Sequence, residues 1–289
     1  MQPLFLTAQA LAAELNNAPD LLLLDSRPPE DFAQGHLPTA RSLPQFFTYL
    51  LPNSSTQGLE ELRRTFQDLL LSAGLKSPQQ RIVVYEEAMD TCKGASCRGA
   101  FICRYLGCSN VAVLDGGLTA WLAAGFQLAQ EEADSGEKGD SKVELVTNSG
   151  LMATAEEVKE AVEGNGVLLL DDRDEEEWRG LSSSPYGVDY CPRKGRIPGA
   201  RWLLWTRLMQ ETKDGIQVMK SAEAIRREAA QHGFTDPTAP IIVYCFKGAR
   251  ASNTAMALEY AGFSKVRNYF ASWNEWSRDK LLPTDSALL

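Results

Sequence analysis

One cysteine in this sequence has the surroundings of a reactive sulfur. Cys245 follows an apolar run at 241–244, and the turn after it reads Phe246, Lys247, Gly248, Ala249 and Arg250. The run predicts a buried parallel strand, and the stretch after the turn predicts a helix. Free N–H groups at a helix start attract an anion, and two cations add to that attraction. The turn should therefore stabilise the ionised, nucleophilic form of the thiol. We thus interpret Cys245 as a reactive cysteine and not as an inert core residue.

The remaining cysteines give no second pattern of this kind. The chain has six cysteines, namely Cys92, Cys97, Cys103, Cys108, Cys191 and Cys245. They are too scattered for a disulfide framework, and the first four lack the C-x-x-C spacing of a zinc site. We expect these four to be small buried hydrophobes. One alternative stays open, because residues 92–95 resemble the Cys245 turn and Cys92 or Cys97 could be a second reactive thiol.

Composition excludes several classes of function. The net charge of −9 argues against nucleic acid or an anionic membrane as a partner, so any anion site must be local. The sequence has no apolar run of membrane-spanning length, and its first ten residues do not have the pattern of a secretory signal. We expect a cytoplasmic, monomeric protein.

Four sequence blocks occur twice in the same order. Residues 22–27 match 168–173, 35–40 match 195–200, 81–85 match 240–244, and 106–121 match 261–276. This repeat predicts two copies of one domain, at 1–128 and 149–289, joined by an acidic linker at 129–148.

Within each copy, short apolar strands alternate with helix-like segments such as 60–73 and 222–232. The pattern predicts an α/β fold of two tandem domains, each with a mainly parallel five-stranded sheet flanked by helices on both faces. Ligands of such sheets bind beyond the carboxyl ends of the strands, where Cys245 is placed.

The two copies differ at the position of the nucleophile. Aligning the strands at 82–85 and 241–244 sets Glu86 against Cys245. A carboxylate cannot act as the sulfur nucleophile, and the longer acidic turn after Glu86 would repel an anion. The first copy is therefore expected to be inactive.

With these motifs in this order, the sequence resembles the two-domain rhodaneses, the thiosulfate and 3-mercaptopyruvate sulfurtransferases. The residues that carry the resemblance are 25–27, 35–38, 113–117 with Trp121, 195–200, 245–250 and 268–276. The resemblance implies a tandem α/β fold, an inactive N-terminal copy and a Cys245 that carries sulfur as a persulfide. It implies no metal or organic cofactor. The implied partners are a small sulfur donor, thiosulfate or mercaptopyruvate, and cyanide or a thiol as acceptor.

The turn also bears on the choice of donor. In the family, cationic side chains after the cysteine suit the doubly charged thiosulfate, and small polar ones suit mercaptopyruvate. Lys247 and Arg250 therefore favour thiosulfate, although Phe246 departs from the basic residue often found there. The substrate-binding residues expected are Phe246, Lys247, Gly248, Ala249 and Arg250, together with Arg179. Arg179 aligns with a family arginine that binds the anionic end of the substrate, and its alternative role is that of a surface arginine.

Other polar residues are interpreted as structural. Asp171 and Arg173, like Asp25 and Arg27, should hold the loop at a strand end. The carboxylates at 174–177 are interpreted as a solvated run. Two rival functions remain: a phosphatase, whose turn would have five residues between Cys and Arg instead of the four found here, and a non-catalytic regulatory module.

Overall fold

The structure is a computed structural model that describes residues 3–18, 20–91, 93–130 and 143–285. Much of the expected linker, residues 131–142, lies outside the described residues. The described residues form two compact units. Unit 1 takes those of 1–49, 61–148 and 210–219, and unit 2 takes those of 50–60, 149–209 and 220–289. The segment 210–219 thus falls in unit 1 although it lies in the second sequence repeat.

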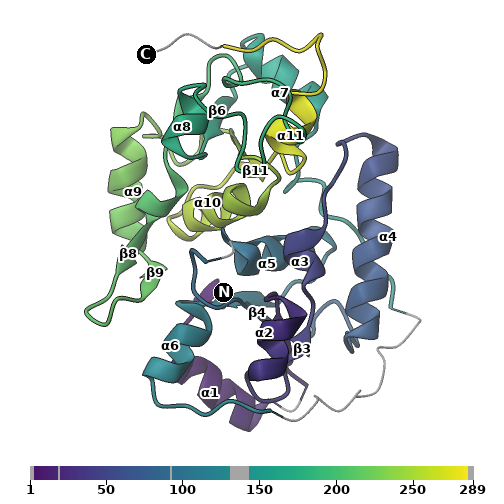
Figure 1. The fold of residues 1–289 in the computed structure, drawn as a ribbon, viewed down its shortest axis with the longest axis vertical. Helices are drawn as coiled ribbons and strands as arrows, with labels where there is room; N and C mark the ends of the chain where they lie inside the picture. Colours follow the sequence, from purple (N-terminus) through teal and green to yellow (C-terminus); the bar gives the residue numbers. More distant parts are fainter. Residues whose placement is uncertain (1–2, 19, 92, 131–142, 286–289) are drawn as a thin grey trace. The chain divides into compact units, whose positions relative to one another are not determined.

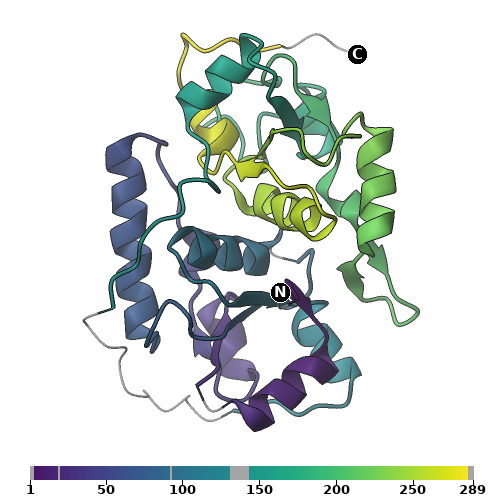
Figure 2. The same ribbon diagram turned by 180° about the vertical axis from the view of Figure 1, so that it is seen from behind.

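The described part of unit 1 contains a five-stranded parallel sheet of order β1-β5-β4-β2-β3. Its strands are β1 (Phe5–Leu6), β2 (Leu22–Asp25), β3 (Arg41–Ser42), β4 (Ile82–Tyr85) and β5 (Val111–Leu114). Every residue of β2, β4 and β5 is buried, as expected for a sheet covered on both faces. Figure 2 shows the purple strand β1 at the edge of this sheet.

Helices cover both faces of the unit 1 sheet. They are α1 (Ala8–Asn17), α2 (Pro29–Gln34), α3 (Gln45–Thr48), α5 (Ala95–Tyr105) and α6 (Gly117–Ala123), while α4 (Thr56–Ser72) begins in residues of unit 2. Figure 1 shows α1 and α6 on one side of the sheet, and α5 with α3 on the other. Leu11 of α1 and Trp121 of α6 pack with Leu23 and Val83 of the strands in one buried cluster.

Unit 2 repeats this plan with a shorter sheet. Its described strands are β6 (Leu168–Asp171), β7 (Arg201–Trp202), β10 (Ile241–Tyr244) and β11 (Val266–Asn268), all paired in parallel in the order β11-β10-β6-β7. At the position of a fifth strand, a single parallel bridge joins Met152 to Asn268. The chain turns into α7 at once, because Thr154 caps that helix in a capping box with Glu157.

The helices of unit 2 are α7 (Ala155–Val162), α8 (Glu175–Trp178), α9 (Ala222–Gln231), α10 (Ala249–Tyr260) and α11 (Ser272–Trp276), with a 3₁₀ turn η1 at Trp205–Leu208. A hairpin of β8 (Met209–Glu211) and β9 (Gln217–Met219) follows η1. The helix predicted at 222–232 is confirmed as α9, and the one at 60–73 lies within α4 apart from its last residue. α10 is buried along Ala249–Leu258, so the turn before it leads into a helix that is packed in the core. Of the helices described, none has the length and hydrophobicity to cross a membrane.

Candidate active site

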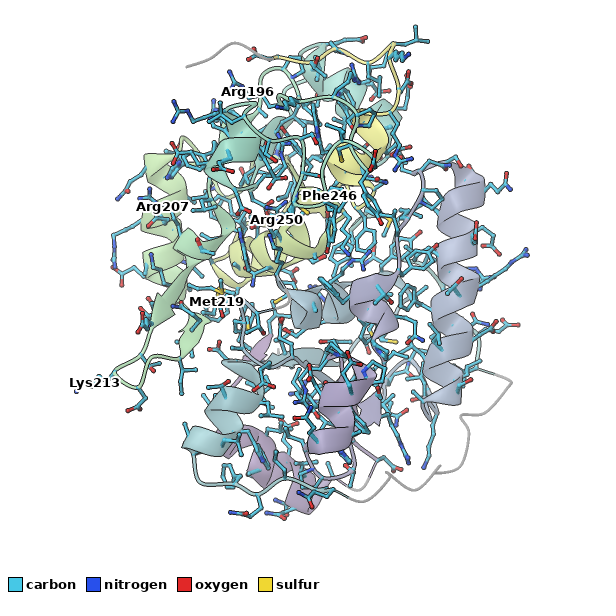
Figure 3. All side chains as sticks on the ribbon, in the orientation of Figure 1. Arg196, Arg207, Lys213, Met219, Phe246 and Arg250 are labelled. Carbon is cyan, nitrogen blue, oxygen red and sulfur yellow. The ribbon has the colours of Figure 1, made fainter. Side chains whose placement is uncertain are left out.

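The turn between β10 and α10 brings a thiol to the start of a buried helix. Gly248 caps α10 in the left-handed conformation, with φ 85°, which glycine adopts without steric cost. Its N–H donates to Cys245 Sγ at 3.1 Å. Cys245 is only 1% exposed. Figure 3 labels Phe246 and Arg250, which belong to the same turn. The sulfur therefore lies where a helix start can stabilise negative charge.

Ser272, at the start of α11, fixes the backbone of the cysteine. Its Oγ accepts the Cys245 N–H at 3.1 Å, donates to the Tyr269 carbonyl at 2.7 Å and lies 4.0 Å from Sγ. The Trp273 N–H donates to the Cys245 carbonyl at 3.1 Å. Ser272 has φ 58°, an uncommon value for a residue other than glycine. Such strain is often found at functional sites.

Arg250 is bound through a bidentate ion pair. Glu177 accepts from its Nη1 at 2.6 Å and from its Nη2 at 3.1 Å, and Asp174 lies 3.1 Å from Nη1. Burial alone would lower the pKa of Arg250, but Glu177 outweighs burial and the charge of Cys245 adds to it, so the pKa is raised well above the usual value. The interpretation of 174–177 as a solvated run is wrong for Glu177, which is 2% exposed. In the sequence, Glu177 could not be distinguished from the other acidic residues of this short helix.

A second buried carboxyl group lies in this network. Asp172 directly follows β6, and its Oδ2 accepts from Thr254 Oγ1 at 2.7 Å. Burial raises its pKa well above the usual value, and Asp171 and Glu177 add to the shift while Arg250 opposes it. Burial thus favours the protonated form of Asp172 over its carboxylate.

Aromatic rings surround the first two residues after the cysteine. The Phe246 ring lies 5.2 Å from the Tyr186 ring and 6.5 Å from the Tyr190 ring, measured between centroids. Lys247 Nζ lies 5.2 Å from the centroid of Tyr186, a cation–π distance. The ammonium of Lys247 is thus held near the turn by a residue of a distant loop.

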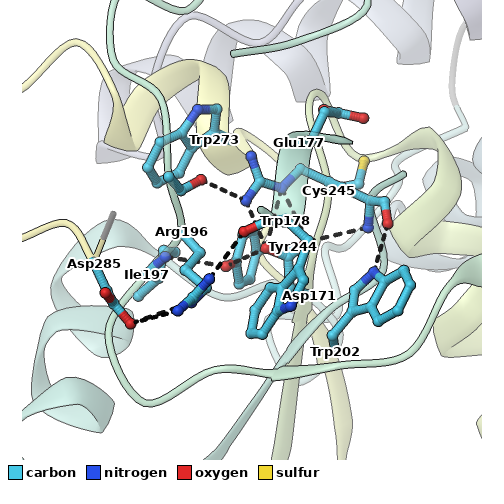
Figure 4. Close-up of polar contacts among 12 residues, drawn as sticks. Asp171, Glu177, Trp178, Arg196, Ile197, Trp202, Tyr244, Cys245, Trp273 and Asp285 are labelled. Atoms are coloured by element: carbon cyan, nitrogen blue, oxygen red, sulfur yellow. Dashed lines mark hydrogen bonds and ion pairs between the residues drawn. The ribbon is translucent and has the colours of Figure 1, made fainter. Parts of the chain in front are cut away.

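The predicted scaffold role of the repeated Asp and Arg agrees with the contacts. Arg173 donates to both oxygens of Asp171, and Tyr244 donates its hydroxyl proton to Asp171 at 2.6 Å while accepting the Ile197 N–H (Figure 4). Asp25 and Arg27 form the same pair in unit 1, where the Tyr85 hydroxyl accepts the Leu37 N–H. These buried pairs hold the strand-end loops of both repeats.

In the corresponding turn of unit 1, a carboxylate of the protein binds the start of the helix. Glu86 follows β4, is fully buried, and its Oε1 accepts from the Ser96 N–H at 3.1 Å and from the Ser96 hydroxyl at 2.6 Å. Gly94, with φ 82°, caps α5 as Gly248 caps α10. A built-in carboxylate therefore satisfies the helix start where the other unit places a sulfur.

The other described cysteines are buried thiols. Cys97 and Cys103 lie on α5, and Cys108 and Cys191 are buried as well. Burial raises the pKa of Cys108 to about 12 and that of Cys191 to about 11, so neither is a thiolate near neutral pH. Cys92, considered above as a second reactive thiol, lies outside the described residues.

Arg179 ends α8 and is 45% exposed. Within the described residues, the ion pair recorded for it is with Glu175, at 3.4 Å, which is one turn earlier. Its role in substrate binding stays a prediction. Of the predicted turn residues, Gly248 contacts the Cys245 sulfur through its N–H.

Comparison with known proteins identifies the family of the two repeats. Residues 7–124 and 154–279 each match the Rhodanese-like domain family. The chain is 27% identical to a thiosulfate sulfurtransferase of Azotobacter vinelandii, over 98% of this chain and 97% of the relative. It is 32% identical to a probable 3-mercaptopyruvate sulfurtransferase of Pseudomonas aeruginosa, over 96% of each.

Solved structures show the same fold. The 3-mercaptopyruvate sulfurtransferase SseA of Escherichia coli superposes with a TM-score of 0.75 at 22% identity, covering 94% of this chain and 99% of that one. The wild-type structure of EanB gives 0.78 at 21% identity, covering 100% of this chain and 72% of that one. The twofold domain match, the repeated Asp–Arg scaffold and the turn at Cys245 lead to one conclusion: the chain belongs to the rhodanese family and carries two rhodanese-like domains in tandem.

Proposed function

We propose that this protein is a sulfurtransferase that moves a sulfane sulfur from thiosulfate to cyanide or a thiol through a persulfide on Cys245. The Cys245 thiolate attacks the outer sulfur of thiosulfate, the bond to the sulfonate sulfur breaks, and sulfite leaves with the electron pair. The acceptor then attacks the outer sulfur of the persulfide and releases the thiolate. Charge and atoms balance without an oxidant.

The observation that carries the proposal is the hydrogen bond from the Gly248 N–H to Cys245 Sγ at 3.1 Å. The donor is part of the helix start, so it costs no reorganisation when negative charge appears on the sulfur. Ser272 supports the same geometry by holding the Cys245 N–H. A buried structural cysteine would not need this arrangement.

Thiosulfate is our preferred donor, and mercaptopyruvate is the second candidate. The ammonium of Lys247, held over Tyr186, supports a doubly charged donor. Arg179 would bind the anionic end. Arg250 already pairs with Glu177, so it would assist an anionic donor through its charge, which also acts on Cys245. The name of the Pseudomonas aeruginosa relative favours mercaptopyruvate, so the two donors must be compared directly.

We further propose that only the C-terminal domain, at 149–289, is catalytic, and that the N-terminal domain, at 1–128, is inactive. The linker between them would span 129–148. The buried Glu86 carboxylate supports the second point, because it occupies the helix start of α5 in place of a nucleophile or an anion.

The experiment is an assay of thiocyanate formed from thiosulfate and cyanide. The wild-type protein should be active, Cys245→Ser should be inactive, and Cys191→Ser should retain activity as the matched control. Thiocyanate formation by Cys245→Ser at the wild-type rate would reject the mechanism. Phosphatase activity that depends on Cys245, with no thiocyanate, would favour the phosphatase alternative.

A further inference from the structure

Unit 1 contains a cavity of about 650 Å³, which we call the Arg41 cavity. Leu22 and Arg41, the first residues of β2 and β3, both line it. Because the strands are parallel, these residues mark the amino edge of the sheet, whereas Glu86 follows the carboxyl end of β4. The cavity is therefore separate from the turn that corresponds to the Cys245 turn. Its volume falls in the range of small-molecule sites, about 300 to 1,000 Å³.

Much of the wall of the Arg41 cavity is apolar. Trp121 and Phe126 line it with rings whose centroids are 4.5 Å apart. Leu15 of α1 and Leu21, just before β2, line it as well. Trp121 Nε1 donates to the Gln127 carbonyl at 3.0 Å, and this bond fixes the orientation of the ring. Such a surface binds the apolar body of a ligand, and the two rings favour a body that itself contains a ring.

Three charged side chains line the cavity, namely Asp20, Arg41 and Lys76. Lys76 Nζ lies 3.1 Å from Asp20 Oδ1, so these two charges balance each other. Arg41 is only partly exposed, and in the described part of the chain its side chain forms no hydrogen bond, ion pair or ring contact. The cavity thus has one net positive charge, on a guanidinium whose geometry suits a carboxylate.

The second repeat has an equivalent arginine, but there the protein itself supplies the partner. Arg201 begins β7 in the same register against β6 as Arg41 has in β3 against β2. Arg201 Nη1 donates to the Gly233 carbonyl, and its guanidinium lies 5.8 Å from the centroid of the Phe234 ring. Gly74 takes the place of Gly233 in unit 1, and it lines the cavity together with Arg41. One arginine of this repeated pair is therefore satisfied by the chain, and the other is left to the cavity.

Thr39 lies in the same wall in a strained conformation. Its φ is 67°, a value that a β-branched residue rarely adopts. The second repeat has Gly199 at this position, with φ 77°, so a glycine would meet the same need at lower cost. Strain of this kind is concentrated at ligand and active sites. A threonine here offers a hydroxyl to an anion bound at Arg41.

We infer that the Arg41 cavity is a binding site for a small amphipathic acid, with one carboxylate on Arg41 and an apolar, ring-bearing body against Trp121 and Phe126. A bare anion would leave the apolar walls uncovered, and a neutral apolar ligand would leave the guanidinium without a partner. The site lies in the repeat that lacks the nucleophile and uses no sulfur chemistry. The inference therefore stands apart from the function proposed above.

Isothermal titration calorimetry of the full chain tests the site, with naphthalene-2-acetate as the probe. The wild type should bind this acid, and it should bind the neutral naphthalene-2-acetamide and plain acetate at least about tenfold more weakly. Arg41→Ala should weaken the binding of naphthalene-2-acetate by at least about tenfold. Arg201→Ala removes the equivalent arginine of the second repeat, so it is the matched control and should keep the wild-type Kd.

Thermal unfolding gives a second measurement. Without the probe, Arg41→Ala should have the Tm of the wild type, because no contact of this side chain is lost. Saturating naphthalene-2-acetate should raise the Tm of the wild type and of Arg201→Ala, each relative to the same protein without the probe, and leave that of Arg41→Ala unchanged.

Four results would overturn the inference: no saturable binding by the wild type, equal affinity for the acid and its amide, an unchanged Kd in Arg41→Ala, or a lower Tm of Arg41→Ala without the probe. An unchanged Kd would place the probe elsewhere, for example at the Cys245 turn. A lower Tm would show that the guanidinium already has a partner within the chain. Thiocyanate formation tests the proposed function separately, so the two failures can be told apart.

Discussion

Glu177 binds Arg250 through both carboxylate oxygens, at 2.6 and 3.1 Å, and both side chains are buried. This ion pair joins α8 to the first turn of α10. Arg250 lies in that turn, five residues after Cys245. It fixes the Cys245 turn against α8 and leaves the charge of Arg250 largely balanced by carboxylates of the protein.

Breaking this pair should destabilise unit 2. Glu177→Gln removes the buried counter-charge of the guanidinium and leaves the half-exposed Asp174, so we expect a loss of about 3 kcal/mol in the free energy of unfolding. Urea denaturation measures it. Glu176→Gln, at an exposed neighbouring position, is the control and should change stability by less than about 0.5 kcal/mol. Equal losses in both variants would show that the pair is not a main support of the turn.

The turn itself should not tolerate a side chain at its glycine. A Cβ on Gly248 would lie 2.7 Å from the Phe270 carbonyl oxygen and from its ring, in addition to the cost of φ +85°. Gly248→Ala should therefore displace the N–H from Cys245 Sγ and lower kcat at least about tenfold. Gly262→Ala separates the steric clash from the cost of the positive φ. Gly262 also has a positive φ, but the nearest atom to its added Cβ would be 3.8 Å away. That control should lose about 1 kcal/mol of stability and keep kcat, and a Gly248→Ala enzyme with normal kcat would contradict the role of the turn.

Removing the ammonium at the turn should weaken binding of the more highly charged donor. Lys247→Ala is expected to raise KM for thiosulfate about tenfold and KM for mercaptopyruvate by less, since one charge contact is worth 1 to 2 kcal/mol by rough estimate. Steady-state kinetics with both donors measures the difference. Lys159→Ala, at an exposed lysine of the same unit, serves as the control. A similar increase for the two donors would show that Lys247 does not distinguish their charge.

A partly buried acid in unit 1 should make stability depend on pH. Asp115 Oδ1 accepts the Met219 N–H at 2.8 Å, and burial raises the pKa of this carboxyl from 3.8 to about 6. The folded state thus binds the proton more tightly than the unfolded state. The stability gained from the protonated acid is present in full below about pH 4 and is lost as the pH rises through about 6.

Asp115→Asn keeps an oxygen acceptor for Met219 and cannot ionise. The stability of the variant relative to the wild type should rise between pH 4 and pH 7, by up to about 3 kcal/mol. Thermal or urea unfolding of both proteins across this range measures the difference. A difference that does not change with pH would mean that Asp115 titrates as it would in an unfolded chain.

Most of the fold was predictable because its signals are local or repeated. The matched blocks predicted two copies, the apolar runs at 82–85 and 241–244 are buried strands, and Glu86 and Cys245 follow them at equivalent positions. The second sheet has one strand fewer in its described part, because the helix cap at Thr154 follows the bridge at Met152 too closely for a strand to form.

The parts of the site that were missed depend on contacts between distant residues. Glu177 looks like its exposed neighbours in sequence, and only the packing of α8 turns it toward Arg250. Ser272 bonds to Cys245 from 27 residues away, through a backbone angle that serine rarely adopts. Tyr186 meets Lys247 from a loop whose sequence shows no periodicity. The repeat offered one signal for the unusual backbone of Ser272. The first copy has Gly117 at the equivalent position, and a glycine there indicates a positive φ.

The most direct test of the central claim is mass spectrometry of the protein after incubation with thiosulfate, followed by peptide mapping under non-reducing conditions. The account predicts one added sulfur atom, located on the peptide that contains Cys245 and released by cyanide. A protein that gains no sulfur, or gains it on a peptide containing another cysteine, would contradict it.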